Sequence, residues 1–234
     1  MDVVIVGGPH SGVGKTLASE IALRALAGRR YGAIKLTVAD GERDLEHDHG
    51  SSALAVADAA GICGRGMSCG VCETVSTKVP SRLITAEGAI KKPGTDTWRL
   101  SNAGAVAVAW IISLREAAPD AVEAAMRYLA SKGAQGVVIE GTTALDWMKP
   151  KASVMVATDP GRKWKEVALK HVGTCDIVLC NAVPVAPGDE AAPAAFLNAD
   201  PLACDLAFAD DRGTQLYELL LLERCTTGAQ RTTA

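Results

Sequence analysis

The chain has 234 residues, of which 48% are apolar and 22% are charged. This length and composition allow one sizeable hydrophobic core. The formal net charge of −3 supplies no overall field for attracting nucleic acid or an anionic membrane. No apolar run reaches the roughly 20 residues of a membrane-spanning helix, and the first residues are typical of a strand rather than a signal peptide. We therefore expect a cytoplasmic protein that binds neither nucleic acid nor membranes.

Apolar runs rich in β-branched residues alternate with segments of helical apolar spacing. The runs predict strands at 3–6, 31–37, 105–112, 136–139, 153–157 and 177–180. The helical spacing predicts helices at 16–26, 120–131, 162–171 and 214–222. Alternation of this kind is typical of βαβ units, so the sequence predicts an α/β fold with a mostly parallel sheet flanked by helices.

Two segments do not follow the alternation. Residues 41–93 hold an acidic segment with histidines, an Ala-rich stretch, a Gly/Cys loop and a polar stretch. We interpret them as an insertion that leaves the sheet, a place where function often lies. Residues 225–234 are polar and aperiodic, which predicts a flexible tail. The expected organisation is one domain over 1–224 with the insertion at about 41–93.

A glycine-rich loop follows the first predicted strand. It consists of Gly8, Pro9, His10, Ser11, Gly12, Val13, Gly14, Lys15 and Thr16. Polyphosphate binding needs converging backbone N–H groups, a helix N-terminus, a cation and a hydroxyl for Mg²⁺. Gly12 and Gly14 permit close backbone approach, Lys15 supplies the charge, and Thr16 opens the helix as a Mg²⁺ ligand. We expect the whole loop to bind a nucleoside triphosphate and the protein to hydrolyse it.

The predicted strand at 136–139 is followed by a carboxylate and a glycine, Glu140 and Gly141. In a parallel sheet the carboxyl ends of the strands face the ligand crevice. Glu140 is therefore expected near the γ-phosphate and Mg²⁺. The alternative is a solvent-exposed glutamate at the end of a strand.

Pro9 stands where the usual G-x4-G-K-[ST] motif has its first glycine, and the nearest glycine, Gly8, lies one residue earlier. The resulting G-x5-G-K-T spacing resembles the deviant P-loop of the signal-recognition, MinD and biotin-synthesis class of NTPases, in particular that of dethiobiotin synthetases. The Ala33-Ile34-Lys35 segment, the segment 93–105 and the Glu140-Gly141 strand stand in an order similar to that of the accessory GTP-binding proteins of molybdopterin-guanine dinucleotide synthesis. The resemblance covers roughly residues 1–160. It implies a P-loop NTPase fold and a homodimer.

The same resemblance implies roles for four further residues. Asp40 would join Thr16 and Glu140 as a Mg²⁺ ligand, and the implied catalytic set is Lys15, Glu140 and Asp40. Asp96 and Arg99 would lie near the phosphates or an acidic substrate, and Lys35 would face the same cleft. From the residues alone, Asp96 could equally be a turn or N-cap residue, and Arg99 could form a surface salt bridge.

Asn181 follows the last predicted strand without the Lys and Asp of the guanine-reading Asn-Lys-x-Asp motif. The segment looks more like the Asn-x-x-x-Pro stretch that contacts adenine in dethiobiotin synthetases. ATP is therefore favoured over GTP. The alternative is that Asn181 simply caps the end of the strand.

Three cysteines, Cys63, Cys69 and Cys72, form a C-x5-C-x2-C pattern in a glycine-rich loop. Thiolates are the usual ligands of Fe–S clusters and structural zinc, and we favour Fe–S because a second C-x2-C pair is missing. His47 or His49, a substrate, or the partner subunit could supply a fourth ligand. The alternatives are three reduced thiols or a redox-active pair. The other cysteines, at 175, 180, 204 and 225, are interpreted as small hydrophobic residues.

Together these features favour a Mg²⁺-dependent triphosphatase acting in metallocofactor maturation or metal insertion, with a metal site coupled to nucleotide state. Its partner would be a client metalloenzyme or a cofactor-synthesis enzyme. One alternative is an ATP-dependent ligase or kinase in which Lys35, Asp96 and Arg99 hold a small acidic substrate. Another is a carrier of metal and nucleotide without useful hydrolysis.

Overall fold

The computed structural model describes residues 1–39, 74–157, 164–180, 217–223 and 225. Its strands are β1 (Asp2–Gly7), β2 (Tyr31–Ala39), β3 (Ser81–Ile84), β4 (Val108–Leu114), β5 (Gly136–Glu140), β6 (Ala152–Ala157) and β7 (Ile177–Cys180). Its helices are α1 (Lys15–Ala25), α4 (Glu87–Ile90), α5 (Asp96–Asn102), α6 (Ala118–Ser131) and α7 (Glu166–Val172), with 3-10 turns η1 (Ala27–Arg29) and η3 (Thr142–Asp146). Residues 217–223 are also helical.

The strands form one seven-stranded sheet in the order β3-β4-β2-β5-β1-β6-β7. Every pairing is parallel except that of the edge strand β3 with β4. The expected α/β fold with a mostly parallel sheet is thereby confirmed. β1 lies between β5 and β6, so the loop that leaves β1 starts beside the carboxyl end of β5.

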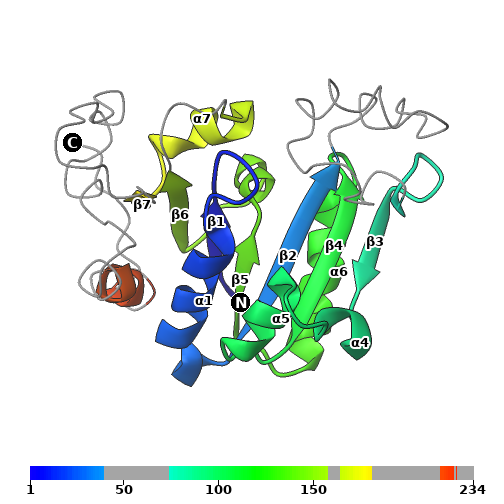
Figure 1. The fold of residues 1–234 in the computed structure, drawn as a ribbon, viewed down its shortest axis with the longest axis horizontal. Helices are drawn as coiled ribbons and strands as arrows, with labels where there is room; N and C mark the ends of the chain where they lie inside the picture. The colour runs from blue at the N-terminus through cyan, green and yellow to red at the C-terminus, as the bar shows by residue number, and fades with distance from the viewer. Residues whose placement is uncertain (40–73, 158–163, 181–216, 224, 226–234) are drawn as a thin grey trace.

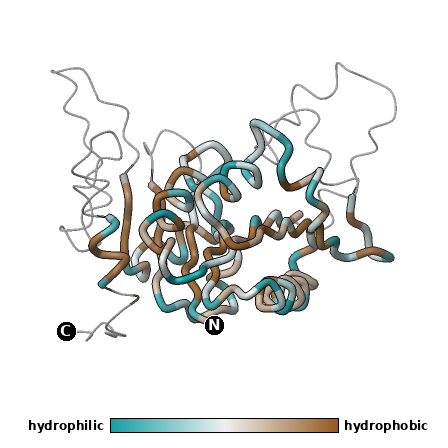
Figure 2. The backbone as a smooth tube through the Cα atoms, turned by 90° about the horizontal axis from the view of Figure 1, so that it is seen from below, coloured by the Kyte–Doolittle hydropathy of each residue, from teal (hydrophilic) through white to brown (hydrophobic). Residues whose placement is uncertain are grey.

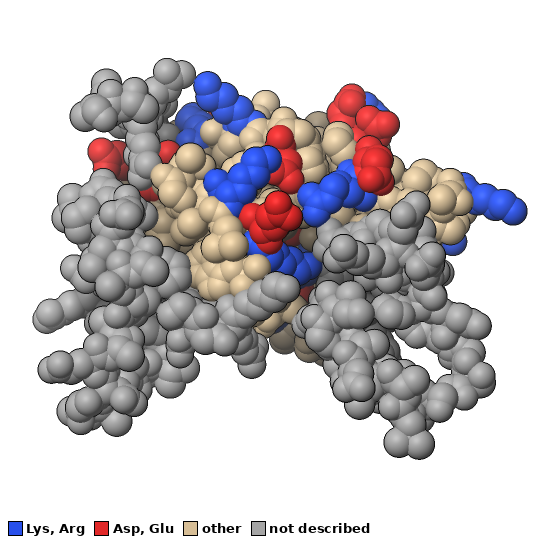
Figure 3. All heavy atoms as spheres, turned by 90° about the horizontal axis from the view of Figure 1, so that it is seen from above, with Lys and Arg blue, Asp and Glu red and all other residues tan. Residues whose placement is uncertain are grey.

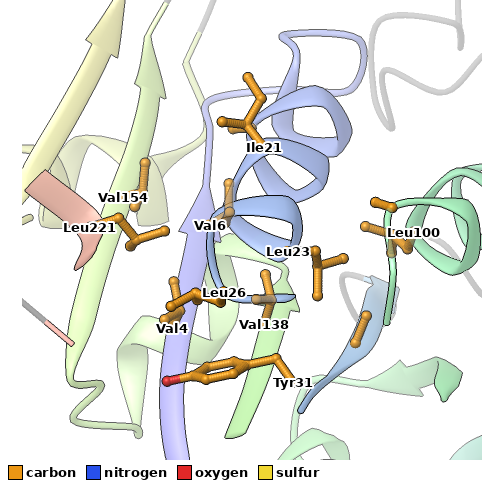
Figure 4. Close-up of a cluster of buried hydrophobic side chains, with 14 of the residues drawn as sticks. Val4, Val6, Ile21, Leu23, Leu26, Tyr31, Leu100, Val138, Val154 and Leu221 are labelled. Carbon is orange, nitrogen blue, oxygen red and sulfur yellow. The ribbon is translucent and has the colours of Figure 1, made fainter. Parts of the chain in front are cut away.

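Helices cover both faces of the sheet (Figure 1). On one face α1, α5 and the helical residues 217–223 pack over β1, β5 and β6. In Figure 4 the apolar side chains of α1 lie over Val4, Val6 and Val138 of the sheet. α6 and η3 contribute to the core on the opposite face, where α7 packs on the β6–β7 side. Figure 2 shows apolar stretches along the strands in the middle of the molecule, as burial of a sheet on both faces requires.

The insertion predicted at about 41–93 does not leave the sheet over its whole length. Residues 81–84 form β3, whose backbone pairs antiparallel with β4 from Ser81 opposite Ser113 to Ile84 opposite Trp110. An edge strand has one unburied side and needs no strict apolar alternation. The sequence Ser-Arg-Leu-Ile therefore carried no strand signal, and residues 40–73 lie outside the described part of the chain.

The predicted tail also begins too early. Cys225 is 2% exposed and packs in the same core cluster as Tyr217 and Leu221. The Tyr217 hydroxyl donates to the carbonyl of Ala18 on α1 at 3.1 Å, and Arg29 donates to the carbonyl of Cys225 at 3.3 Å. Cys225 thus belongs to the folded domain, as a small hydrophobic residue. No helix among the described residues is both long and apolar enough to cross a membrane.

Candidate functional site

The loop from Gly8 to Gly14 joins the carboxyl end of β1 to the start of α1. Gly12 and Gly14 have φ of 80° and 104°, left-handed conformations that side chains rarely adopt. A Cβ at Gly8 would lie 2.6 Å from Val13 Cγ1 and 3.2 Å from the Val156 carbonyl oxygen. Val13 itself is 2% exposed and packs in the core. The glycines therefore allow a tight loop, and the buried Val13 side chain attaches this loop to the hydrophobic core.

α1 begins directly after this loop. Its N-cap is Gly14, and no side chain caps its first turn. The first N–H groups of a helix have no partner within the helix, and they carry the positive end of the helix dipole. Backbone donors and a positive potential are thus directed toward the loop, the arrangement that binds phosphate at helix N-termini.

Lys15 is the first residue of α1, and its ammonium is the cation of the loop. It donates a hydrogen bond to the His10 carbonyl oxygen at 2.6 Å. Burial lowers its pKa to about 8, and attraction to Glu140 offsets only part of that effect. Within the described ranges no carboxylate lies at salt-bridge distance from it. Lys15 is therefore a desolvated cation whose hydrogen-bond partner is a loop carbonyl, which a phosphate oxygen could replace.

Glu140 ends β5 beside the loop, opposite Val6 of β1 on one side and Lys35 of β2 on the other. It is 2% exposed, so it is not the solvent-exposed strand-end glutamate that the sequence left open. Its Oε1 accepts hydrogen bonds from the Thr16 hydroxyl at 3.1 Å and from the Lys35 ammonium. Its Oε2 is buried and has no partner among the described residues.

Lys35 on β2 connects two carboxylates, one on the neighbouring strand β5 and one on α5. Its ammonium donates to Asp96 Oδ2 at 2.7 Å and to Glu140. Burial alone would lower its pKa, but attraction to Glu140 and Asp96 outweighs burial and raises it. For Asp96, burial would raise the pKa, but Lys35 and a hydrogen bond from Thr16 lower it. Both groups are thus stabilised in their charged forms.

Asp96 is not a helix cap. The N-cap of α5 is Thr95, whose hydroxyl accepts from Trp98 N at 3.3 Å, and Asp96 is the first residue of the helix. That position directs the Asp96 carboxylate to the Lys35 ammonium rather than to its own helix. Asp96 therefore belongs to the cluster around Glu140.

Arg99, one turn further along α5, binds elsewhere. Its guanidinium forms two hydrogen bonds, of 2.7 and 3.1 Å, with the carboxylate of Glu20 on α1. The Arg99 side chain is 38% exposed and that of Glu20 is 9% exposed. The structure thus gives Arg99 the salt bridge that the sequence left open as its alternative role.

Thr142 is a site residue that the sequence reasoning missed. Its hydroxyl accepts a hydrogen bond from the Gly8 N–H at 2.9 Å and donates one to the Gly8 carbonyl at 2.8 Å. Thr142 follows Glu140 and Gly141 in the chain. A Cβ at Gly141 would lie 2.7 Å from the Cβ of Leu36, so only glycine lets the chain after β5 pass this close to Leu36. The only available signal was its place two residues after the strand-end carboxylate.

The oxygen donors gathered here fit Mg²⁺. The Thr16 hydroxyl and the carboxylates of Glu140 and Asp96 are hard ligands, and Glu140 Oε2 is a buried acceptor without a protein partner in the described ranges. The predicted ligand Asp40 lies outside those ranges. No group of three His, Cys, Asp or Glu side chains suited to a metal occurs in the part of the chain that the structure describes. A Mg²⁺ ion here would be held by the Thr16 hydroxyl together with the two carboxylates.

The remaining predicted site residues divide into two groups. His10 and Ser11 form the outer part of the loop, where His10 Nδ1 lies 2.8 Å from the Ser11 carbonyl oxygen. The others lie outside the described residues: Asn181, Cys63, Cys69 and Cys72. Figure 3 shows acidic and basic side chains next to one another near the middle of the face seen from above, toward which the parallel strands point.

The arrangement thus places a glycine-rich loop at a helix N-terminus, one desolvated lysine and a buried carboxylate at the same edge of the sheet. Charged and polar groups that converge on one edge of an open parallel sheet are typical of a ligand crevice. Comparisons with models of protein families, with curated proteins and with solved structures gave no match.

Proposed function

We propose that this protein is a Mg²⁺-dependent nucleoside triphosphatase of the P-loop type, with ATP favoured over GTP. The observation that carries the proposal is the contact between the Thr16 hydroxyl and the buried Glu140 carboxylate, at the end of the loop that holds Lys15. A hydroxyl at the second residue of the helix and a carboxylate on a neighbouring strand are the protein groups that P-loop enzymes use for Mg²⁺.

The residues divide the work of binding and hydrolysis. Backbone N–H groups of the loop and the first turn of α1 bind phosphate oxygens, and Lys15 exchanges the His10 carbonyl for a β- or γ-phosphate oxygen. Bound Mg²⁺ would neutralise charge that develops on the phosphates. Glu140 Oε1 accepts the hydrogen bond of the Thr16 hydroxyl and holds it in place, and Glu140 Oε2 would be the carboxylate oxygen offered to Mg²⁺. Water attacks the γ-phosphorus and passes its proton to a γ-phosphate oxygen, the bond to the β-phosphate oxygen breaks, and phosphate and the diphosphate leave.

The ion pairs favour this reaction over the ligase or kinase alternative. That alternative needs Lys35 and Arg99 to hold an acidic substrate. Lys35 is already paired with Glu140 and Asp96, and Arg99 with Glu20. An acidic substrate would have to displace carboxylates from both cations, whereas a triphosphate at Lys15 displaces only a backbone carbonyl.

The proposed biological role is metallocofactor maturation or metal insertion, with nucleotide state coupled to metal bound at Cys63, Cys69 and Cys72. This part of the proposal rests on the sequence pattern alone. It implies a client metalloenzyme or cofactor-synthesis enzyme as partner. The dimer implied by the family resemblance belongs to the same proposal.

Phosphate release by the purified protein tests the triphosphatase proposal. Wild type should release phosphate from Mg²⁺-ATP without an added substrate, and excess EDTA should abolish release. Lys15→Ala should lose triphosphate binding, whereas Glu140→Gln should still bind but hydrolyse at least about 100-fold more slowly, because a preorganised charged group is removed. Lys91→Ala, in an exposed pair with Glu87, is the matched control and should match wild type.

Two results would count against the proposal. Equal nucleotide binding by wild type and Lys15→Ala would mean that the loop is not the phosphate site. Phosphate release only after addition of a small carboxylic acid or amine would favour the ligase or kinase. GTP and ATP assayed in parallel decide the base preference.

A further inference from the structure

Residues 140–142 contact both ends of the glycine-rich loop. At the far end of the loop, Glu140 accepts a hydrogen bond from Thr16, the second residue of α1. At the near end, Thr142 binds both backbone groups of Gly8. One short segment after β5 therefore touches the loop where it leaves the sheet and where it enters the helix.

The single hydroxyl of Thr142 bonds both the N–H and the carbonyl of Gly8. A hydroxyl has one proton to donate and lone pairs to accept with, and here the donor and one acceptor are both used on the same glycine. Both hydrogen bonds are buried, and Thr142 is 8% exposed. The Thr142 methyl group packs against Gly7, the residue before Gly8, since a Cβ on Gly7 would lie 3.2 Å from Thr142 Cγ2.

Both backbone groups of Gly8 are held by the Thr142 hydroxyl. A larger residue is excluded, because a Cβ there would overlap Val13 Cγ1. A glycine without side-chain contacts is free to adopt many backbone conformations. The Thr142 hydroxyl removes that freedom at the residue where the loop turns away from β1.

We infer that Thr142 is a positioning residue for triphosphate binding, which fixes the Gly8 peptide so that the loop N–H groups converge on the phosphates. This inference rests on the proposed function. Thr142 acts through Gly8 and not on the nucleotide itself. The adjacent Pro9 carbonyl accepts the N–H of Lys165 at 3.1 Å, so the start of the loop is held from η3 and from the residue before α7.

Four single variants test the inference. Thr142→Ser keeps the hydroxyl and removes the methyl group, Thr142→Ala removes both, and Thr142→Val keeps the shape but removes the hydroxyl. Thr143→Val is the matched control, because no hydrogen bond of the neighbouring Thr143 side chain occurs within the described residues. Each purified variant is titrated with Mg²⁺-ATP well below its thermal midpoint, and the turnover number and Michaelis constant of each are measured.

Loss of the hydroxyl leaves a buried N–H and a buried carbonyl of Gly8 unpaired and releases the loop. Thr142→Ala and Thr142→Val should therefore raise the Kd for Mg²⁺-ATP by roughly tenfold or more. Thr142→Ser and Thr143→Val should stay within about threefold of wild type. The comparison of Ser with Ala isolates the hydroxyl even if Thr142→Val does not fold.

A purely structural role gives a different result. In that case Thr142→Ala would melt earlier than Thr142→Ser, yet the folded proteins would share the same Kd and the same kinetic constants, and the inference would be overturned. That outcome would leave the triphosphatase proposal intact, because wild type would still bind and hydrolyse ATP. Failure of wild type itself to bind ATP would instead remove the proposed function, and the inference with it.

Discussion

Lys35 on β2 and Glu140 on β5 lie opposite each other in the parallel register of the two strands, and the Lys35 ammonium donates a hydrogen bond to the Glu140 carboxylate. Their side chains are 18% and 1% exposed. A buried ion pair is costly to desolvate, and removal of one partner leaves an uncompensated charge. The pair therefore holds a carboxylate beside the glycine-rich loop at a cost in stability that other residues must offset.

Removal of the Lys35 ammonium should destabilise the fold. We expect Lys35→Met to lower the free energy of unfolding by about 3 kcal/mol, because Glu140 loses its buried cation. The double variant Lys35→Met/Glu140→Gln should recover most of that loss, since no buried charge is left unpaired. Urea denaturation at pH 7 measures both. Glu140→Gln alone completes the cycle, and a loss in the double variant equal to the sum of the two single losses would show that the two groups are not energetically coupled.

Removal of the Lys15 ammonium should have the opposite effect on stability. Its pKa in the folded protein is about 8, below the value of 10.5 for a free lysine, so the buried charge opposes folding at pH 7. This penalty is complete below about pH 8 and fades as pH rises toward 10.5, because the folded protein then binds fewer protons than the unfolded chain.

Lys15→Met should therefore be more stable than wild type at pH 7, on the order of 1–3 kcal/mol. The advantage should shrink as pH approaches 10. Urea denaturation at pH 7, 8.5 and 10 provides the measurement. Loss of ATP binding in the same variant would link the stability cost of the buried charge to nucleotide binding. A destabilised variant at pH 7 would mean that Lys15 is a structural lysine.

Arg99 should matter for packing rather than for turnover. Its guanidinium ties α5 to Glu20 of α1, and its side chain is partly exposed. Arg99→Ala should lower the free energy of unfolding by about 1 kcal/mol and should change the catalytic efficiency with Mg²⁺-ATP by less than about threefold. The control is Arg127→Ala, in an exposed pair with Glu123. An efficiency reduced by about 100-fold or more would assign Arg99 to the phosphates instead.

The cysteine pattern predicts a metal site that spectroscopy can test. Protein purified without oxygen should contain iron and absorb in the visible range, or contain zinc and remain colourless. Cys69→Ser should lose the metal, whereas Cys175→Ala, at a buried cysteine away from the pattern, should keep it. Wild type without iron or zinc, and unchanged by Cys69→Ser, would exclude the proposed metal site.

Local patterns were enough to predict the sheet and the loop. Buried parallel strands are continuous apolar runs, so β1, β5 and β6 were visible in the sequence within one or two residues of their ends. Gly12 and Gly14 indicated a loop that permits close backbone approach, and the structure adds that both have positive φ. The strand β3 was missed because its pairing comes from the free edge of β4 and not from its own residues.

Only the tertiary structure decided which groups meet. Lys35 and Glu140 are 105 residues apart in the chain, Thr142 and Gly8 are 134 apart, and Arg99 and Glu20 are 79 apart. Residue types at one position restrict the chemistry available there, and the sequence by itself thus determined the loop, its lysine and the strand-end carboxylate. Partners depend instead on strand order and register, which arise when distant segments bury their apolar faces together.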